Sequence, residues 1–225
     1  MDQLYKYETH LHTSEASACG EISGAEHVRS YKEAGYAGII VTDHFFNGNS
    51  CVPDNLPWEE RVNLLCRGYE NAKEEGERIG LSVFFGWEAN FNATEFLIYG
   101  LDKNWLLAHP DILSWTIEEQ YSRIHEDGGY IVHAHPFRVR SYIREVRLFP
   151  EYVDAVEGIN ARNYNADYDR QAMAYAKKHR LPVTAGTDAH GYESIHSGLA
   201  FRHKLESISD FIESIKLGNY ELIEL

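Results

Sequence analysis

Four short motifs in this sequence combine histidine with a second histidine or with aspartate at spacings that suit metal coordination. They are His10/His12, His133/His135, Asp188/His190 and Asp43/His44. Alternate residues of a strand project to the same face, where two imidazoles can hold one cation. One HxH pair is weak support, because 12 histidines in 225 residues give roughly 0.6 such pairs by chance. Four motifs that each fall at the end of a predicted strand indicate a metal site.

The donor atoms on offer are imidazole nitrogens and carboxylate oxygens, which suit Zn²⁺, Mn²⁺ or Fe²⁺ better than Ca²⁺ or an iron–sulfur cluster. Glu88 joins the candidates because it ends an apolar strand, where an unpaired carboxylate would be costly; pairing with an arginine or exposure to water is the alternative. The candidate ligands are His10, His12, His44, Glu88, His135, Asp188 and His190. Seven ligands exceed the needs of one tetrahedral ion, so we expect two or three divalent ions with a carboxylate between them.

The segments that carry these residues alternate between short apolar runs and amphipathic stretches. Capping boxes pair Ser23 with Glu26 and Thr116 with Glu119, and each predicts the start of a helix. Further helices are predicted over residues 58–80, 168–179 and 208–217. Strands are predicted at the first HxH pair and over residues 38–44, 81–88, 95–101, 130–136, 154–160 and 181–190.

Alternating strands and helices favour parallel strands joined by helical crossovers, in either a closed barrel or an open doubly wound sheet. The positions of the candidate ligands distinguish these two folds. They lie at the C-terminal ends of several strands, which a barrel gathers around one mouth, whereas an open sheet concentrates its site at one switch point. We therefore expect an α/β barrel of about seven strands, formed by a single domain over residues 1–225.

The composition narrows the choice of partner. A formal charge of −14 and a pI near 5.3 make nucleic acid an unfavourable partner, since no basic track exists for its backbone. Three cysteines without a CxxC pair favour neither a disulfide framework nor a zinc ribbon. The N-terminus lacks the features of a signal peptide, and no apolar run approaches the roughly 18 residues of a membrane span. We expect a cytoplasmic protein with a small substrate and no membrane partner; no sequence feature fixes its oligomeric state.

Five motifs occur in order along nearly the whole chain: HLH at 10–12, TDH at 42–44, WE at 87–88, AHPFR at 134–138 and TDAH at 187–190. This ordered set resembles the PHP (polymerase and histidinol phosphatase) family. The resemblance implies a distorted TIM-like barrel of about seven βα units with a metal cluster at its C-terminal mouth. It also implies three ligand sets: His10, His12, Glu88 and Asp188 for one ion, Glu88 and His135 for a second, and His44 and His190 for a third.

The chain departs from the family pattern after the first HxH pair. Members with a third ion usually have a histidine or aspartate there, and this sequence offers Glu15, Cys19 or Glu21 instead. The distance to the helix cap at Ser23 favours Cys19.

A second departure lies in the segment EFLIYGL, where phosphatase members often have a histidine. The corresponding residue here is apolar, and Leu97 is assigned to that position. The ion shared by Glu88 and His135 is therefore expected to be weakly held or absent. At least two metals are expected in total.

Arg138 directly follows the HP pair of the fourth motif, and we predict that it is a catalytic residue that clamps phosphate oxygens; a surface arginine is the alternative. If the strand over residues 130–136 is regular, His133 faces the same side as His135. It would then be a hydrogen-bond partner of a metal ligand, a proton donor or a buried interior histidine. Asn160, Arg162 and His196 are weaker candidates for the pocket wall.

These features predict a metal-dependent phosphoesterase that hydrolyses a small phosphate monoester, as a histidinol-phosphatase-like enzyme does, by attack of a hydroxide that bridges two metal ions. Three alternatives stay open: a phosphodiesterase or nuclease-like member of the family, a protein-tyrosine phosphatase, and a non-enzymatic metal-binding module. The acidic charge balance argues against long nucleic acids.

Overall fold

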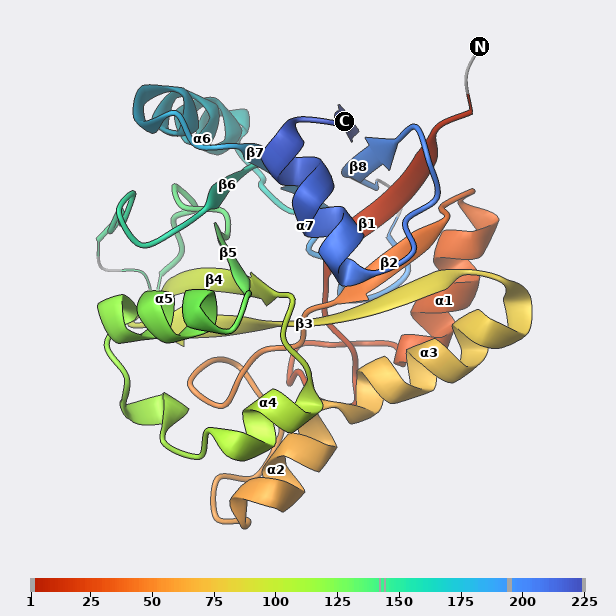
Figure 1. Cartoon of the computed structure of the whole chain (residues 1–225), viewed down its shortest axis with the longest axis vertical. Helices are drawn as coiled ribbons and strands as arrows, with labels where there is room; N and C mark the ends of the chain where they lie inside the picture. Colours follow the sequence, from red (N-terminus) through yellow and green to blue (C-terminus); the bar gives the residue numbers. More distant parts are fainter. Residues whose placement is uncertain (1–2, 142, 144, 194–195, 224–225) are drawn as a thin grey trace.

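The computed structural model describes residues 3–141, 143, 145–193 and 196–223. Within these ranges the strands are β1 (Tyr5–Leu11), β2 (Gly38–Val41), β3 (Ser82–Phe91), β4 (Thr94–Tyr99), β5 (Tyr130–His133), β6 (Ala155–Asn160), β7 (Val183–Gly186), β8 (Gly198–Phe201) and β9 (Glu221–Ile223). They form one mixed sheet in the order β7-β6-β5-β4-β3-β2-β1-β8-β9. The sheet is strongly curved, and most of the helices lie outside the curve (Figure 1).

Two backbone hydrogen bonds join β1 to the chain that follows β7. The N–H of His12 donates to the carbonyl of Ala189 at 2.8 Å, and the N–H of Ala189 donates to the carbonyl of His10 at 3.1 Å. The strands β1 to β7 therefore surround one interior, while β8 and β9 extend the sheet from the N-terminal half of β1. This nearly closed sheet confirms the α/β barrel that the sequence predicts.

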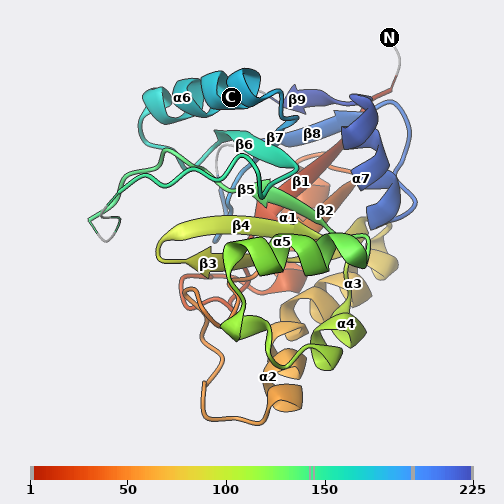
Figure 2. The same ribbon diagram turned by 60° about the vertical axis from the view of Figure 1, so that its left-hand side comes forward.

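The helices are α1 (Gly24–Glu33), α2 (Trp58–Leu65), α3 (Arg67–Ile79), α4 (Lys103–Ala108), α5 (Ile117–Glu126), α6 (Ala166–His179) and α7 (Ile208–Leu217), with a short 3₁₀ helix, η1 (Ile112–Ser114). Both predicted capping boxes form, at Ser23 before α1 and at Thr116 before α5. Figure 2 shows α5 beside β4 and α6 beside β6, whereas α4 packs against α2. Among the described residues, no helix is long and apolar enough to cross a membrane.

The helix predicted over residues 58–80 is two helices, α2 and α3, whose axes change at Cys66. A close approach explains the break. A β-carbon on Gly68 would overlap the Thr13 hydroxyl, and one on Gly24 would overlap the Gly68 carbonyl. The first turn of α3 therefore packs directly against α1 and the loop after β1, and α3 takes its direction from that contact.

The prediction of parallel strands throughout is wrong for β4, which pairs antiparallel with both β3 and β5. No helix separates β3 from β4. Their two-residue turn consists of Asn92 and Ala93, with φ of 52° and 63°. Two central residues with positive φ are typical of a type I′ hairpin, whose twist matches that of the flanking strands. The hairpin brings the start of β4, including Glu95, to the mouth of the barrel.

Glu8 stabilises β1 at a shift in its register with β2. Its Oε1 accepts hydrogen bonds from the backbone N–H groups of Thr9 (2.9 Å), His10 (2.8 Å) and Thr187 (2.9 Å). The Tyr31 hydroxyl donates to Oε2 at 2.7 Å. Burial raises the pKa of Glu8 to about 7, although these hydrogen bonds oppose the rise. Because Oε1 alone accepts the three backbone bonds, a glutamine in this place keeps those three bonds, while the Tyr31 hydroxyl turns from donor to acceptor.

The His125–Asp154 pair predicts a pH dependence of stability. The His125 Nε2 lies 2.8 Å from Asp154 Oδ1, and the hydrogen bond to Asp154 raises the pKa of His125. This contribution is complete below the ordinary histidine pKa of about 6.5 and is lost as the pH rises through the raised value. We expect His125→Gln to cost about 0.5–1 kcal/mol at pH 5.5 and less at pH 9 in chemical denaturation. An equal cost at both pH values would contradict this. His109→Gln is the control, because His109 Nδ1 bonds the Trp105 carbonyl instead of a carboxylate.

Candidate metal centre

The structure brings all seven predicted ligands together at the C-terminal mouth of the barrel. His10 lies on β1 and His12 follows it, His44 follows β2, Glu88 lies on β3, His135 follows β5, and Asp188 and His190 follow β7. Every one of these side chains is buried, with an exposed fraction of 8% or less. Residues from 10 to 190 thus meet in one place because the parallel strands β1, β2, β3, β5 and β7 end at the same mouth.

In the first cluster, two imidazoles and two carboxylates lie at distances typical of ligands that share a cation. The Nε2 atoms of His10 and His12 are 3.1 Å apart. Asp188 Oδ1 lies 3.6 Å from the first and 3.3 Å from the second. The Glu88 carboxylate lies 3.3 Å from His10 Nε2 and 3.6 Å from His12 Nε2. Donors at 2.0–2.1 Å from a tetrahedral cation are about 3.3–3.4 Å apart, so the distances of both carboxylates from the two imidazoles suit ligands of one ion.

The hydrogen bonds around the two imidazoles direct both Nε2 atoms at this point. His10 Nδ1 lies 2.9 Å from Glu157 Oε1, and His12 Nδ1 lies 3.4 Å from Ser17 Oγ, whose own proton goes to Asp43 at 2.7 Å. Each Nδ1 is therefore the protonated nitrogen. Two facing Nε2 atoms at 3.1 Å need a proton or a cation between them, and a divalent ion would satisfy both at once.

The charges of the first cluster also favour a cation. Burial would raise the pKa of Glu88, but His44 and His10 hold it well below its usual range. Burial would also raise the pKa of Asp188, but Arg138 and His10 hold it well below its usual range. Both carboxylates are therefore ionised in the barrel interior at neutral pH. Burial would lower the pKa of His10, yet the surrounding carboxylates raise it well above the usual range, which shows how strongly this point attracts positive charge.

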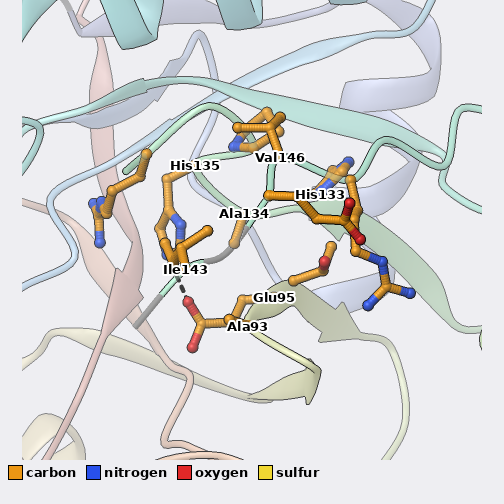
Figure 3. Close-up of a pocket in the computed structure, with 12 residues that line it drawn as sticks. Ala93, Glu95, His133, Ala134, His135, Ile143 and Val146 are labelled. Carbon is orange, nitrogen blue, oxygen red and sulfur yellow. Dashed lines mark ion pairs between the residues drawn. The ribbon is translucent and has the colours of Figure 1, made fainter. Parts of the chain in front are cut away.

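The second cluster contains a residue that the sequence interpretation missed. Glu95 Oε2 lies 3.6 Å from His135 Nε2 (Figure 3). Glu88 Oε1 lies 3.2 Å from the same nitrogen. His44, Glu88 and Glu95 also form a group with ligand atoms near one another. The assignment of Leu97 to this position is wrong, because Leu97 lies in the hydrophobic core. The reason is the hairpin, which places Glu95, two residues earlier on the same face of β4, at the mouth.

Glu95 thus adds a candidate carboxylate ligand to the second site, which the sequence predicted to be weak or absent. We expect Glu95→Gln to bind one metal ion fewer than the natural protein, because the amide removes a negative charge beside His135 while the first cluster stays intact. Elemental analysis after dialysis measures this. The control is Glu74→Gln, an exposed glutamate on α3. A variant with unchanged metal content would remove Glu95 from the ligand set.

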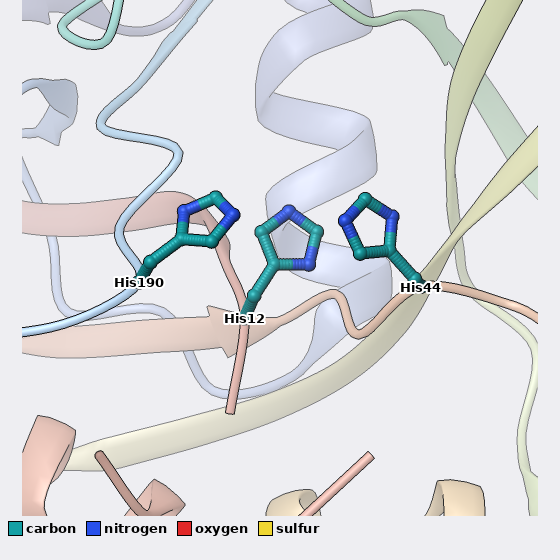
Figure 4. A group of neighbouring side chains, drawn as sticks. All are labelled: His12, His44 and His190. Atoms are coloured by element: carbon teal, nitrogen blue, oxygen red, sulfur yellow. The ribbon is translucent and has the colours of Figure 1, made fainter. Parts of the chain in front are cut away.

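The third cluster is a row of three imidazoles, with His12 between His44 and His190 (Figure 4). The ring centroid of His12 is 4.1 Å from that of His44 and 4.7 Å from that of His190. His190 Nδ1 donates to the Asp188 carbonyl at 2.8 Å, which leaves its Nε2 for a ligand. His44 Nδ1 is buried and lies 2.7 Å from Glu88 Oε2, so the third cluster contacts the carboxylate of the first.

Of the three alternatives for a further ligand here, Cys19 lies beside the imidazoles. Burial raises the pKa of the Cys19 thiol, but hydrogen bonds with His190 and His44 outweigh it and lower the pKa to about 6. Glu15 instead accepts a hydrogen bond from the Gly24 N–H at the start of α1. A thiolate at this point adds a soft donor, which favours Zn²⁺ or Fe²⁺ over Mg²⁺ or Ca²⁺.

The strand that ends in His133 is not regular, and the prediction that His133 faces the same side as His135 is wrong. His135 has a φ of 27°, and β5 ends at His133. The His133 ring stacks on Phe96 at 5.1 Å, on the helical side of the sheet. Asp188 is also left-handed, with a φ of 57°. Strained backbone at two candidate ligands is typical of a functional site.

Arg138 lies beside the first cluster and makes three side-chain hydrogen bonds. Its Nη1 donates to Asp188 Oδ2 at 2.6 Å, its Nη2 donates to Asn160 Oδ1 at 2.6 Å, and its Nε donates to Asn163 Oδ1 at 2.9 Å. Its role as a phosphate clamp stays a prediction. Arg162, which pairs with Glu193 Oε1 at 3.1 Å, stands further out on the same wall.

A pocket of about 610 Å³ lies above the three clusters. Its inner surface contains Cys19, His44, Glu88, Glu95, His135, Asp188 and His190. Its outer surface contains asparagines on one side, Asn47, Asn49 and Asn90, and basic or aromatic residues on the other, Arg138, Arg140, Arg162 and Tyr164. His196 packs against Tyr31 and Tyr36 and does not line this pocket. The volume is in the range of sites for small molecules.

The comparisons with known proteins agree with this fold. The PHP-associated family matches residues 168–220. An uncharacterized protein of Methanocaldococcus jannaschii is 30% identical over 137 residues, which are 58% of this chain and 48% of that protein. The match thus spans about half the length of this curated relative.

Two solved structures share the architecture. One is a two-domain protein of Bacteroides vulgatus that contains a predicted PHP-like metal-dependent phosphoesterase, with a TM-score of 0.69 at 14% identity over 98% of this chain and 64% of that chain. The other is an amidohydrolase of Chromobacterium violaceum, with a TM-score of 0.60 at 13% identity over 96% of this chain and 98% of that chain. The resemblance to the PHP family is confirmed: the chain has the PHP-type barrel and a PHP-associated segment near its C-terminus.

Proposed function

We propose that this protein is a metal-dependent phosphoesterase that hydrolyses a phosphate monoester of a small molecule. The observation that carries the proposal is the convergence of overlapping groups of buried histidine and carboxylate side chains beneath one pocket of about 610 Å³. A single structural cation would need only one closed set of four ligands. Adjacent groups that meet at Glu88 and open to a pocket suit hydrolysis assisted by two or three metals.

The ligand sets assign the residues to individual cations. They are His10, His12, Glu88 and Asp188 for the first, Glu88, Glu95 and His135 for the second, and Cys19, His44 and His190 for the third. The donor types favour Zn²⁺, Mn²⁺ or Fe²⁺. When bound, such cations supply Lewis-acid activation of water and offset the charge on phosphoryl oxygens.

Three arginines that line the pocket, Arg138, Arg140 and Arg162, provide a binding site for the phosphoryl group. Of the five N–H groups of a guanidinium, Arg138 uses three in hydrogen bonds to the protein, which leaves two for substrate oxygens in the pocket that it lines. Arg140 and Arg162 add positive charge further out on the same wall. In a chain with a net charge of −14, this local charge favours entry of a small anion.

The test is a phosphate-release screen with the purified protein, loaded with Mn²⁺ or Zn²⁺ and treated in parallel with a chelator. The panel contains monoesters (histidinol phosphate, nucleotides and sugar phosphates), an aryl diester, a phosphotyrosine peptide and an amide. We expect turnover of small monoesters that chelation abolishes and metal restores. Activity that survives exhaustive chelation would contradict the proposal, and so would turnover confined to the diester or the amide. Bound metal without turnover on any substrate would favour a metal-binding module.

A further inference from the structure

Glu157 is a buried carboxylate on β6 that contacts two of the candidate ligands. Its Oε1 accepts a hydrogen bond from His10 Nδ1 at 2.9 Å, and its Oε2 accepts one from the backbone N–H of His135 at 2.9 Å. The side chain is 0% exposed. A carboxylate that holds the distal nitrogen of a ligating histidine sets both the tautomer and the orientation of that ring.

A chain of hydrogen bonds continues from Glu157 to a second ligand of the first cluster. Asn160 Nδ2 donates to Glu157 Oε2 at 2.9 Å, and Arg138 Nη2 donates to Asn160 Oδ1 at 2.6 Å. Arg138 Nη1 donates to Asp188 Oδ2 at 2.6 Å. The other oxygen of Asp188, Oδ1, lies 3.6 Å from His10 Nε2. This series of hydrogen bonds therefore begins at His10 and ends at Asp188, two candidate ligands of the same cation.

The glycine at position 186, on β7, leaves room for this contact. A β-carbon on Gly186 would lie 2.7 Å from Glu157 Oε1 and 2.7 Å from the β-carbon of His10. Any larger residue would push apart the two groups that form the hydrogen bond. The packing of β1, β6 and β7 is thus built to let Glu157 reach His10.

We propose that Glu157 is a positioning residue of the metal centre, which fixes the His10 tautomer with Nε2 toward the cation and, through Asn160 and Arg138, holds Asp188 at the same cation. The inference rests on the metal centre of the proposed function, but it concerns cation binding and not turnover. It predicts a specific defect for Glu157→Gln. The His135 N–H and Asn160 Nδ2 both donate to the Oε2 of Glu157. A glutamine must therefore place its oxygen there and its amide nitrogen toward His10 Nδ1. His10 then carries its proton on Nε2, where the cation would bind.

The experiment measures Zn²⁺ affinity by competition with a chromogenic chelator. We expect Glu157→Gln to bind Zn²⁺ roughly 10–100-fold more weakly than the natural protein. Long-range ¹H–¹⁵N NMR spectra of the metal-free proteins at alkaline pH, where the imidazole is neutral, report the His10 tautomer. We expect Nδ1–H in the natural protein and Nε2–H in the variant. The matched control is Glu8→Gln, an equally buried glutamate whose Oε1 alone accepts its backbone bonds; it should keep the natural affinity.

Natural affinity and the natural tautomer in Glu157→Gln would overturn the inference. A natural protein that binds no Zn²⁺ would instead overturn the metal centre itself, so the two failures are distinguishable. If Glu157→Gln does not fold, Asn160→Ala decides the matter, because it cuts the link to Arg138 and leaves the Glu157–His10 bond in place. We expect it to lose about tenfold in affinity with the His10 tautomer unchanged. Unchanged affinity would refute the coupling to Asp188.

Discussion

The Glu88→Gln variant is expected to lose bound metal and at least about a thousandfold in phosphoesterase activity, which corresponds to roughly 4 kcal/mol of transition-state stabilisation. Glu88 reaches all three clusters: its oxygens lie 3.3 Å from His10 Nε2, 3.2 Å from His135 Nε2 and 2.7 Å from His44 Nδ1. Burial would raise the pKa of Glu88, but His44 and His10 hold it well below its usual range, so the carboxylate is ionised. An amide removes this charge and turns one acceptor into a donor that faces a ligand nitrogen.

Elemental analysis and steady-state kinetics on the same preparation test this expectation. Glu8→Gln serves again as the control for loss of a buried carboxylate, and it should keep its metal content and rate. Glu95→Gln gives a graded comparison, because only the second cluster loses a ligand. A Glu88→Gln protein with natural metal content and rate would show that Glu88 does not bridge the cations.

Much of the candidate site could be predicted because parallel topology constrains it. In a barrel, a histidine or aspartate at the end of a predicted strand must lie at the mouth, whichever strand carries it. His10, Glu88 and Asp188 could therefore be assigned to one place although nearly 180 residues separate the first from the last. Residue type then supplied the chemistry, since these donor atoms are typical of divalent metals.

Glu95 was missed because its position depends on a turn that the sequence does not announce. A type I′ hairpin usually has glycine or asparagine at both central positions, and here the second is Ala93. Without that turn, the apolar residues of β4 are interpreted as a separate buried strand. The parity of the strand places Glu95 and Leu97 on the same face, so the choice between them depended on the register, which only the pairing with β3 fixes.

Glu157 and His133 show a different limit. Whether a buried polar residue contacts a site depends on contacts between distant segments, and the 147 residues between His10 and Glu157 leave no local pattern. The regular alternation expected around His133 fails because His135 takes a left-handed conformation. Such strain is sustained by the surrounding structure, in this case by the Glu157 bond to the His135 N–H, and it has no signal in residue type.

Binding of Zn²⁺ is expected to raise the melting temperature by about 8–16 °C at a free concentration of roughly 1,000 times the dissociation constant. Linkage gives about 4.1 kcal/mol under these conditions, and each kcal/mol shifts the midpoint of a protein of this size by about 2–4 °C. The physical reason lies in the first cluster, where the ionised carboxylates of Glu88 and Asp188 are buried against two facing imidazole nitrogens. A cation cancels that charge and satisfies all four donors, whereas the unfolded chain offers no such site.

Scanning calorimetry at several Zn²⁺ concentrations measures the shift, and its dependence on concentration separates linkage from an unspecific effect of salt. Ca²⁺ is the matched control cation, since it requires six to eight oxygen ligands and should give a much smaller shift at the same concentration. Glu88→Gln supplies the matched control protein, in which the shift should largely disappear because the shared ligand is gone. A full shift in that variant would mean that Zn²⁺ binding to the folded protein does not depend on Glu88. The first cluster would then not be the site through which Zn²⁺ stabilises the protein.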